Sequence, residues 1–235
     1  MAIFGISDLH LYFNNPEKEM SLFGNNWENH PSKIEKKWRE KIKDDDLVLI
    51  PGDISWAMSF EEAKKDLEFI ASLPGFKIIL KGNHDYWWGS IKNINNYFKE
   101  NNYKIFAIQY NYFEYKNYII TGIRGWEYRK KMTQKNQKHY DKELYRFDLA
   151  MNSIKDKKKE VIFITHYPPF TEENPNTPFM RKIEEYKRIK YIYFGHLHNV
   201  SNINCDFYNK IINGNSYKIL SADLINFDPI KLLDE

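Results

Sequence analysis

The sequence predicts a single-domain α/β fold with its layers ordered α/β/β/α, and three observations favour this class. The chain has 235 residues, which is typical of one α/β domain and too short for two large ones. Short apolar runs alternate with amphipathic segments of helical periodicity. The apolar runs are continuous, as in strands that other layers cover on both faces. We therefore expect a four-layer sandwich over residues 1–235.

Apolar runs rich in β-branched residues predict the central strands, at 3–8, 47–53, 77–84, 161–166 and 191–196. Each run stops at a cluster of Asp, His, Asn or Gly residues. In layered α/β folds the loops that follow the strands gather along one edge of the sheet. The polar clusters are therefore expected at that edge, where a functional site would form.

Amphipathic segments predict the helices. Residues 32–42 place Ile34, Trp38 and Ile42 at intervals of four, and 59–62 form a capping box that begins a second helix. A third helix is expected from residue 90 and a fourth over 140–154, with the polar segment 134–139 as an exposed loop before it. Near the end, the segments 217–221, 224–227 and 230–233 predict a closing antiparallel set of strands.

Composition narrows the class of protein. The 35 Lys and Arg against 32 Asp and Glu leave a net charge of +3, which argues against a surface that coats nucleic acid. Cys205 is the single cysteine, so an intramolecular disulfide is excluded, and no segment resembles a signal peptide. The apolar runs are far shorter than the roughly 20 residues needed to span a bilayer. We expect a soluble protein of the reducing cytoplasm.

Side chains that can bind metal ions stand at or just beyond the predicted strand ends: Asp8, His10, Asp53, Asn83, His166, His196 and His198. The pairs 8/10 and 196/198 have i, i+2 spacing, which in extended backbone directs both side chains to one side. Carboxylate and imidazole together favour Mn²⁺, Fe²⁺, Co²⁺, Ni²⁺ or Zn²⁺ over Ca²⁺. Each motif alone also fits an ordinary turn, cap or core histidine. Their shared position after strands is what predicts a metal centre.

These motifs resemble the signature of the calcineurin-like metallophosphoesterase family, which runs Asp-x-His, Gly-Asp, Gly-Asn-His-Asp/Glu, His and Gly-His-x-His. The chain has them at 8–10, 52–53, 82–85, 166 and 195–198. The resemblance implies a metallophosphoesterase-type sandwich with two divalent metal ions, Mn²⁺ favoured and Fe, Zn, Ni or Co as alternatives. By resemblance, the first ion would be held by Asp8, His10, Asp53 and His198. The second would be held by Asp53 as a bridge, Asn83, His166 and His196.

The resemblance also implies the chemistry, which is hydrolysis of phosphate mono- or diesters by a hydroxide that bridges the two ions. Only Asp8 and Asp53 among the ligands are anionic, so two divalent ions would leave a positive site that favours an anion. In the family, the histidine after the ligand asparagine binds the phosphoryl group and protonates the leaving oxygen. The resemblance gives this catalytic role to His84, beside Asn83 in substrate binding, with a structural hydrogen bond as the alternative. Asp85 would orient the His84 ring or cap the following turn.

The favoured substrate is a phosphorylated small molecule or a nucleotide. A nucleic-acid phosphodiesterase is an alternative, but DNA-directed relatives add a capping domain, and the chain has only residues 199–235 after its last motif. A non-catalytic metal-binding scaffold is a further alternative, but scaffold members tend to lose ligand or acid residues that are all present here. Mono- and diesters both fit, and the loops near Trp56, Trp87 and 125–140 are expected to set the choice.

A few residues outside the motifs carry weaker expectations. His30 and His139 are expected on the surface. Trp87 and Trp88 closely follow the motif at 82–85. One of them could therefore form a wall of the substrate pocket, or both could serve only packing. Arg124 and the basic run 129–131 could contact a second phosphate or a diester strand, although a solvated loop is the default for such charges.

Overall fold

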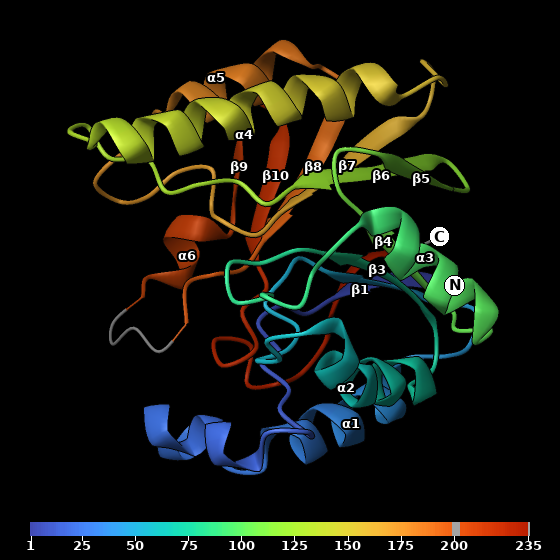
Figure 1. The fold of residues 1–235 in the computed structure, drawn as a ribbon. Helices are drawn as coiled ribbons and strands as arrows, with labels where there is room; N and C mark the ends of the chain where they lie inside the picture. Colours follow the sequence, from blue (N-terminus) through green and yellow to red (C-terminus); the bar gives the residue numbers. More distant parts are fainter. Residues whose placement is uncertain (199–202, 235) are drawn as a thin grey trace.

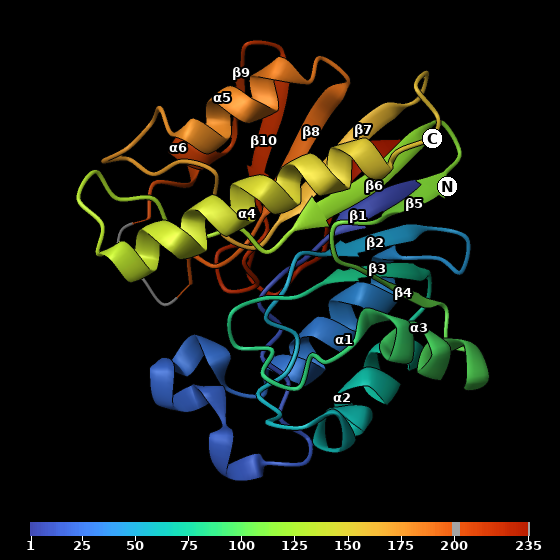
Figure 2. The same cartoon turned by 45° about the horizontal axis from the view of Figure 1, so that its top comes forward.

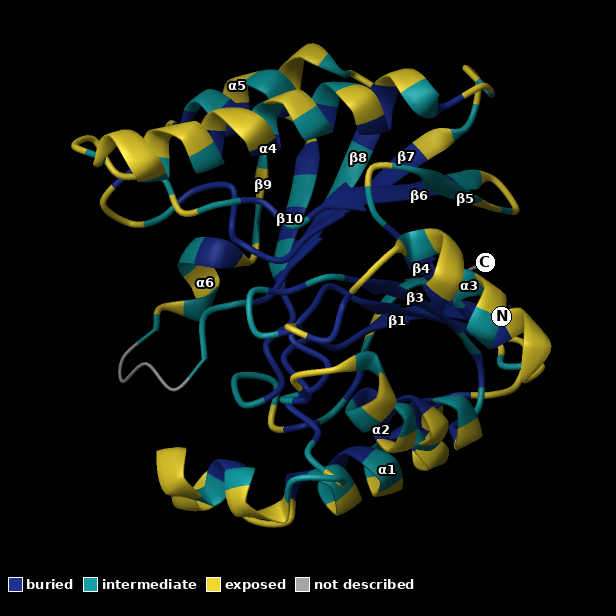
Figure 3. Ribbon diagram, in the orientation of Figure 1, coloured by how far each residue is buried: buried dark blue, intermediate teal, exposed yellow. Residues whose placement is uncertain are grey.

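The computed structural model describes residues 1–198 and 203–234, and it arranges them as two β-sheets packed face to face with helices on the outer faces (Figure 1). The strands of the two sheets are largely buried between the helical layers, whereas the helices expose their outward sides (Figure 3). This architecture confirms the predicted α/β sandwich. Within the described ranges, no helix has both the length and the apolar character that crossing a membrane requires.

The first sheet has the strand order β11-β1-β2-β3-β4. Its strands are β1 (Ala2–Gly5), β2 (Leu47–Ile50), β3 (Phe76–Leu80), β4 (Ile105–Ile108) and β11 (Ile230–Asp234). Strands β1 to β4 are parallel, and β11 pairs with β1 in the antiparallel sense. Leu47 and Leu49 of β2 are fully buried on the side that faces the second sheet. The carboxyl ends of four strands therefore meet at one edge.

The second sheet has the order β5-β6-β7-β8-β10-β9. Its strands are β5 (Tyr112–Tyr115), β6 (Tyr118–Ile123), β7 (Glu160–Thr165), β8 (Ile189–Phe194), β9 (Lys210–Ile212) and β10 (Asn215–Ile219). The inner four are parallel, and β5 and β9 are antiparallel edge strands. Ile162 and Ile164 of β7 pack toward the first sheet, which joins the two sheets through an apolar middle layer.

Helices cover the outer faces of both sheets (Figure 2). On the first sheet lie α1 (His30–Lys41), α2 (Phe60–Ser72) and α3 (Ile91–Glu100), and on the second α4 (Gln134–Ser153) and α5 (Pro178–Glu185). The short helix α6 (Cys205–Tyr208) follows β8, and three 3-10 turns at Pro16–Lys18, Met20–Phe23 and Asn25–Trp27 precede α1. Ser59 caps α2 by accepting a hydrogen bond from the Glu62 amide, as the capping box predicts.

Two expectations about the chain's later part are wrong. Residues 134–139 are not a loop but the first turns of α4, whose capping residue Thr133 accepts a hydrogen bond from the Asn136 amide. The final strands do not form one antiparallel set, because β10 lies parallel to β8 while β11 crosses to the first sheet. Residues 224–227 form turns instead of a strand.

Lys77 in β3 is fully buried, and its ammonium group donates a hydrogen bond to the carbonyl of Leu73. Burial lowers the pKa of Lys77 from 10.5 to about 8. Between those two values the unfolded chain binds more protons than the folded chain, so the free energy of unfolding rises with pH. Relative to Lys77→Met, the wild-type chain should gain about 2 kcal/mol of stability from pH 7 to pH 9.5. Urea unfolding of both chains at the two pH values measures this, and a constant difference would contradict it.

Candidate metal centre

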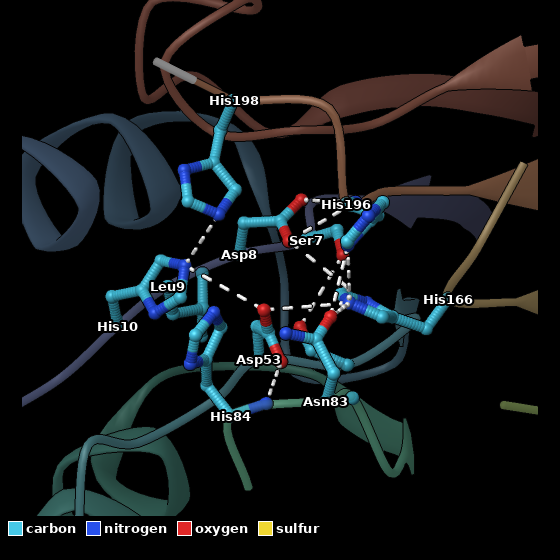
Figure 4. A network of polar contacts seen from close by, with 12 residues as sticks. Ser7, Asp8, Leu9, His10, Asp53, Asn83, His84, His166, His196 and His198 are labelled. Atoms are coloured by element: carbon cyan, nitrogen blue, oxygen red, sulfur yellow. Dashed lines mark hydrogen bonds and ion pairs between the residues drawn. The ribbon is translucent and has the colours of Figure 1, made fainter. Parts of the chain in front are cut away.

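The candidate site lies at the carboxyl ends of β1, β2, β3, β7 and β8, where the loops of both sheets meet (Figure 4). Each predicted motif follows one of these strands: Asp8 and His10 after β1, Asp53 after β2, Asn83 and His84 after β3, His166 after β7, and His196 and His198 after β8. All the predicted ligand side chains come together there. Residues up to 188 positions apart in the sequence are in hydrogen-bonding distance.

One group of donors consists of Asp8, His10, Asp53 and His198, whose ligand atoms all lie within 4.8 Å of one another. The Nε2 atoms of His10 and His198 are 3.0 Å apart, and His10 Nε2 is 3.8 Å from Asp53 Oδ2. The first three residues of the group are fully buried. Such a convergence of nitrogen and oxygen atoms, away from solvent, suits a divalent cation of the transition series.

A second group converges on the other side of Asp53. Asn83 Oδ1 lies 2.7 Å from His166 Nε2 and 2.9 Å from His196 Nδ1, and these two ring nitrogens are 3.3 Å apart. His166 Nε2 is also 3.3 Å from Asp53 Oδ2. Asp53 Oδ2 is therefore close to donors of both groups, yet it is buried without a hydrogen-bond partner among the described residues. The protonated His166 ring offers this oxygen an ion pair, and a bound cation would take the place of that proton.

The electrostatics of Asp53, His10 and His196 fit metal ligands, whereas burial raises the pKa of Asp8. Burial lowers the pKa of His10 and lowers that of His196 to about 3, so both rings are neutral at pH 7. Burial disfavours a charged Asp53, but His166 outweighs it and keeps the pKa of this carboxyl below its usual value. Burial likewise disfavours a charged His166, but the Asp53 carboxylate raises its pKa to about 9. Neutral imidazole and ionised carboxylate are the forms that bind metals, and a cation would displace the His166 proton.

The backbone at the site is not the extended chain expected around residues 8–10. Asp8, His10, Asp53 and His196 have φ values of 58°, 44°, 52° and 73°, in the left-handed region. Residues other than glycine adopt this region at a cost of about 1–3 kcal/mol each, and residues in this region cluster at functional sites. Residues with left-handed backbone, instead of i, i+2 alternation along a strand, bring these side chains into the centre.

Asp85 joins two of the loops that carry the site. Its carboxylate accepts hydrogen bonds from the amides of Asp53, Ile54, Ser55 and Gly82, at 2.7–3.2 Å, and from the Trp87 indole at 2.9 Å. The sequence left a choice between orienting the His84 ring and capping the following turn. The contacts instead show a residue that ties the loop after β2 to the loop after β3.

His84 lies beside the first group. Its amide donates to Asp53 Oδ1 at 2.8 Å, and its ring centroid is 4.4 Å from that of Trp56. The Trp56 ring also stacks on His10 at 4.9 Å. At the second group, Tyr167 packs against His196 with ring centroids 4.0 Å apart. Sequence reasoning did not identify Tyr167, because an aromatic residue after a strand gives no signal that distinguishes it from core.

Burial decides the expectations for His30, His139 and the pair Trp87 and Trp88. His30 is fully buried, with its two ring nitrogens 3.1 Å and 2.9 Å from the carbonyls of Trp27 and Leu9, so its predicted place on the surface is wrong. Burial lowers the pKa of His30 to about 4, so the neutral ring donates its one N–H to one of these carbonyls, which explains a histidine inside. His139 is half-buried against Trp126. Trp87 and Trp88 are buried in the core, which favours packing over a pocket wall.

Gly82 allows the loop after β3 to approach Asp53. A Cβ atom there would lie 2.1 Å from Asp53 Oδ1 and 2.2 Å from its amide nitrogen, closer than real contacts allow. Gly82→Ala should therefore displace Asp53 and lower metal affinity at least about tenfold, the size of effect expected from disturbing groups around a metal site. Gly89→Ala is the matched control, because nothing lies within 4 Å of its Cβ position. Manganese titration of both variants measures the effect, and equal affinities would refute it.

The sandwich and its buried Asp–His cluster define an α/β protein with a candidate metal site at the sheet edge. The family model for calcineurin-like phosphoesterases matches residues 1–200, and the chain belongs to this family. Members of the family are generally hydrolytic phosphoesterases with a metal site. The expected family and fold are thereby confirmed.

Solved structures show the same fold. The protein of unknown function AQ665 from Aquifex aeolicus is similar with a TM-score of 0.51 and 16% identity, over 98% of this chain and 95% of that one. The protein TT1561 of Thermus thermophilus is similar with a TM-score of 0.57 and 10% identity, over 98% of this chain and 97% of that one. No curated protein matches the chain.

Proposed function

We propose that the protein hydrolyses phosphate mono- or diesters of small molecules or nucleotides with the help of two divalent cations, Mn²⁺ being favoured. The observation that carries the proposal is the position of Asp53 Oδ2, which is buried without a hydrogen-bond partner in the described chain and lies near donors of both groups. A shared carboxylate oxygen is what two neighbouring cations would need. Asp8, His10 and His198 would complete one set of ligands, and Asn83, His166 and His196 the other.

The charge of the ligand set favours an anionic substrate. Asp8 and Asp53 are its only carboxylates, so two divalent cations would exceed the ligand charge by two. Both carboxylates are fully buried, so the surroundings have a low polarity. A low polarity strengthens the attraction between the positive site and an anion. When bound, divalent cations would supply Lewis-acid stabilisation of phosphoryl oxygens and lower the pKa of water.

The protein's own contribution to proton transfer comes from His84. Its amide is tied to Asp53, and its ring packs on Trp56, so the imidazole has a defined position beside the centre. Burial lowers the pKa of His84 in the free protein. A phosphoryl dianion next to the ring would favour the protonated form, which could then donate its proton to the leaving oxygen.

The test is a hydrolysis assay combined with metal analysis. We expect the manganese-loaded protein to bind about two ions per chain and to cleave an aryl phosphate or a bis-aryl phosphate. Iron, zinc, nickel and cobalt are tested in parallel. Inactivity on both esters with every metal, although the ions are bound, would overturn the proposal and favour a metal-binding scaffold.

A further inference from the structure

A cavity of about 210 Å³, lined by polar and charged side chains, lies at the carboxyl ends of β3, β4 and β6, at the same sheet edge as the candidate metal centre. Lys81 after β3, Tyr110 after β4 and Arg124 after β6 line it, together with one side of α4. In the ribbon, α4 runs across the second sheet above β6 (Figure 2). Sites that enclose whole drug-sized ligands are typically about 300–1,000 Å³, so this volume suits one group of a larger molecule or a small ion.

The charges around the cavity are strongly unequal. Its cationic lining residues are Lys81, Arg124, Lys142 and Arg146, and its acidic lining residue is Glu143. The side chains of Arg124 and Arg146 are each 24% exposed, and that of Glu143 only 4%. Cations gathered in a partly enclosed space repel one another, and the lining has too few carboxylates to balance them. An anion in the cavity would relieve this repulsion.

The cations are also incompletely paired. Arg146 forms a close ion pair with Glu143 Oε1, whereas the Arg124 guanidinium stays 4.0 Å from the same oxygen. Arg124 Nε is buried and has no hydrogen-bond partner among the described residues. The Lys81 ammonium reaches the Trp88 carbonyl at 3.4 Å. Donors with unused capacity therefore line the cavity.

The cavity is joined to the metal centre through the backbone. The carbonyl of Arg124 accepts hydrogen bonds from the amides of His166 and Tyr167, both at 3.0 Å. Lys81 directly precedes the loop that carries Asn83. Tyr110, on the cavity wall, has a left-handed φ of 53°, which is unusual for a large side chain. The end of β3 therefore positions both a cavity wall and a candidate ligand, and the Arg124 carbonyl ties the end of β6 to the segment after β7.

We propose that this cavity binds an oxyanion of the size of phosphate, supplied by a second phosphoryl or phosphonate group of the substrate. This assignment to the substrate rests on the proposed hydrolytic function, whereas the anion site itself does not. Arginine and lysine donors suit tetrahedral oxyanions. A free phosphate ion has the same chemistry, so binding and kinetics are tested separately.

The binding test titrates the manganese-loaded protein with inorganic phosphate in a calorimeter. The wild-type chain should bind about two phosphates, and Arg124→Met should lose one of them or weaken it at least about tenfold. Glu143→Gln keeps an acceptor for the Gly125 amide but removes the opposing charge, so it should tighten that phosphate roughly threefold. Lys99→Gln, on the exposed side of α3, is the charge-matched control. Unchanged phosphate binding in both cavity variants would overturn the anion site.

The kinetic test compares 4-methylphenyl phosphate with 4-(phosphonomethyl)phenyl phosphate, which differ by one uncleavable anionic group. The wild-type kcat/KM should be about tenfold higher for the second ester, and Arg124→Met should bring the ratio close to one. Equal values for both esters in the wild-type chain would overturn the assignment to the substrate and leave a site for free phosphate. If neither ester is cleaved, the proposed function fails, while the titration still decides the anion site.

Discussion

Replacing Asp53 with asparagine is expected to remove metal-dependent hydrolysis, with a loss of at least about 1,000-fold in kcat, because several kcal/mol of charge stabilisation depend on the cations. Asp53 Oδ2 lies 3.3 Å from His166 Nε2 and 3.8 Å from His10 Nε2, between the two donor groups. An amide carries no charge and cannot act as an anionic bridge. The variant should also bind fewer metal ions, which metal analysis after dialysis measures.

The control for Asp53→Asn is the same exchange at Asp141, which is exposed on α4. Asp141→Asn should keep wild-type activity and metal content. Because Asp53 is buried, thermal unfolding of the variant is measured as well, so that a loss of fold is distinguished from a loss of ligand. A folded Asp53→Asn protein with full metal content and activity would contradict the shared-ligand interpretation.

His84→Ala is expected to lower kcat by about 100- to 10,000-fold while the protein still binds its metal ions, since general acid catalysis typically contributes that much. The size of the loss should depend on the substrate. An alkyl phosphate has a poor leaving group that needs a proton, so its hydrolysis should suffer most. A nitrophenyl phosphate has a good leaving group and should suffer least. Steady-state kinetics on the two esters measures the difference.

Tyr145→Ala is the control for this variant, because Tyr145 lies on α4 and is 62% exposed. It should keep both activity and metal content. An equal loss on both esters in His84→Ala would assign His84 to phosphoryl binding instead of proton donation. Loss of metal ions from His84→Ala would indicate that the Asp53 contact, not the imidazole, is what the substitution disturbs.

Part of the fold and of the candidate site could be predicted because the relevant signals are local. Continuous apolar runs predicted β1, β2, β3, β7 and β8, and the structure places a strand in each. The ligand candidates follow these runs directly, and parallel strands bring their ends to one edge. The start of α4 was missed, since a polar helix on the surface has little apolar periodicity over residues 134–139.

Other features of the site depend on partners that are distant in the sequence. The role of Asp85 follows from amides of the loop after β2, about 30 positions earlier. His30 is buried because the carbonyls of Leu9 and Trp27 face it. The left-handed backbone at Asp8 and Asp53 is not indicated by the sequence, because neither position is a glycine. Neither hydropathy nor spacing along the chain contains this information.

The sequence by itself determined the α/β class, the family resemblance and which side chains could bind metal, because residue types and apolar periodicity are properties of short segments. Only the tertiary structure decided how close those side chains lie, that Asp53 Oδ2 is near both donor groups, and that Lys81, Arg124 and Arg146 line one cavity. Distances between loops depend on strand order and on the packing of two sheets. Those are set by burial of the apolar middle layer, to which strands of both sheets contribute.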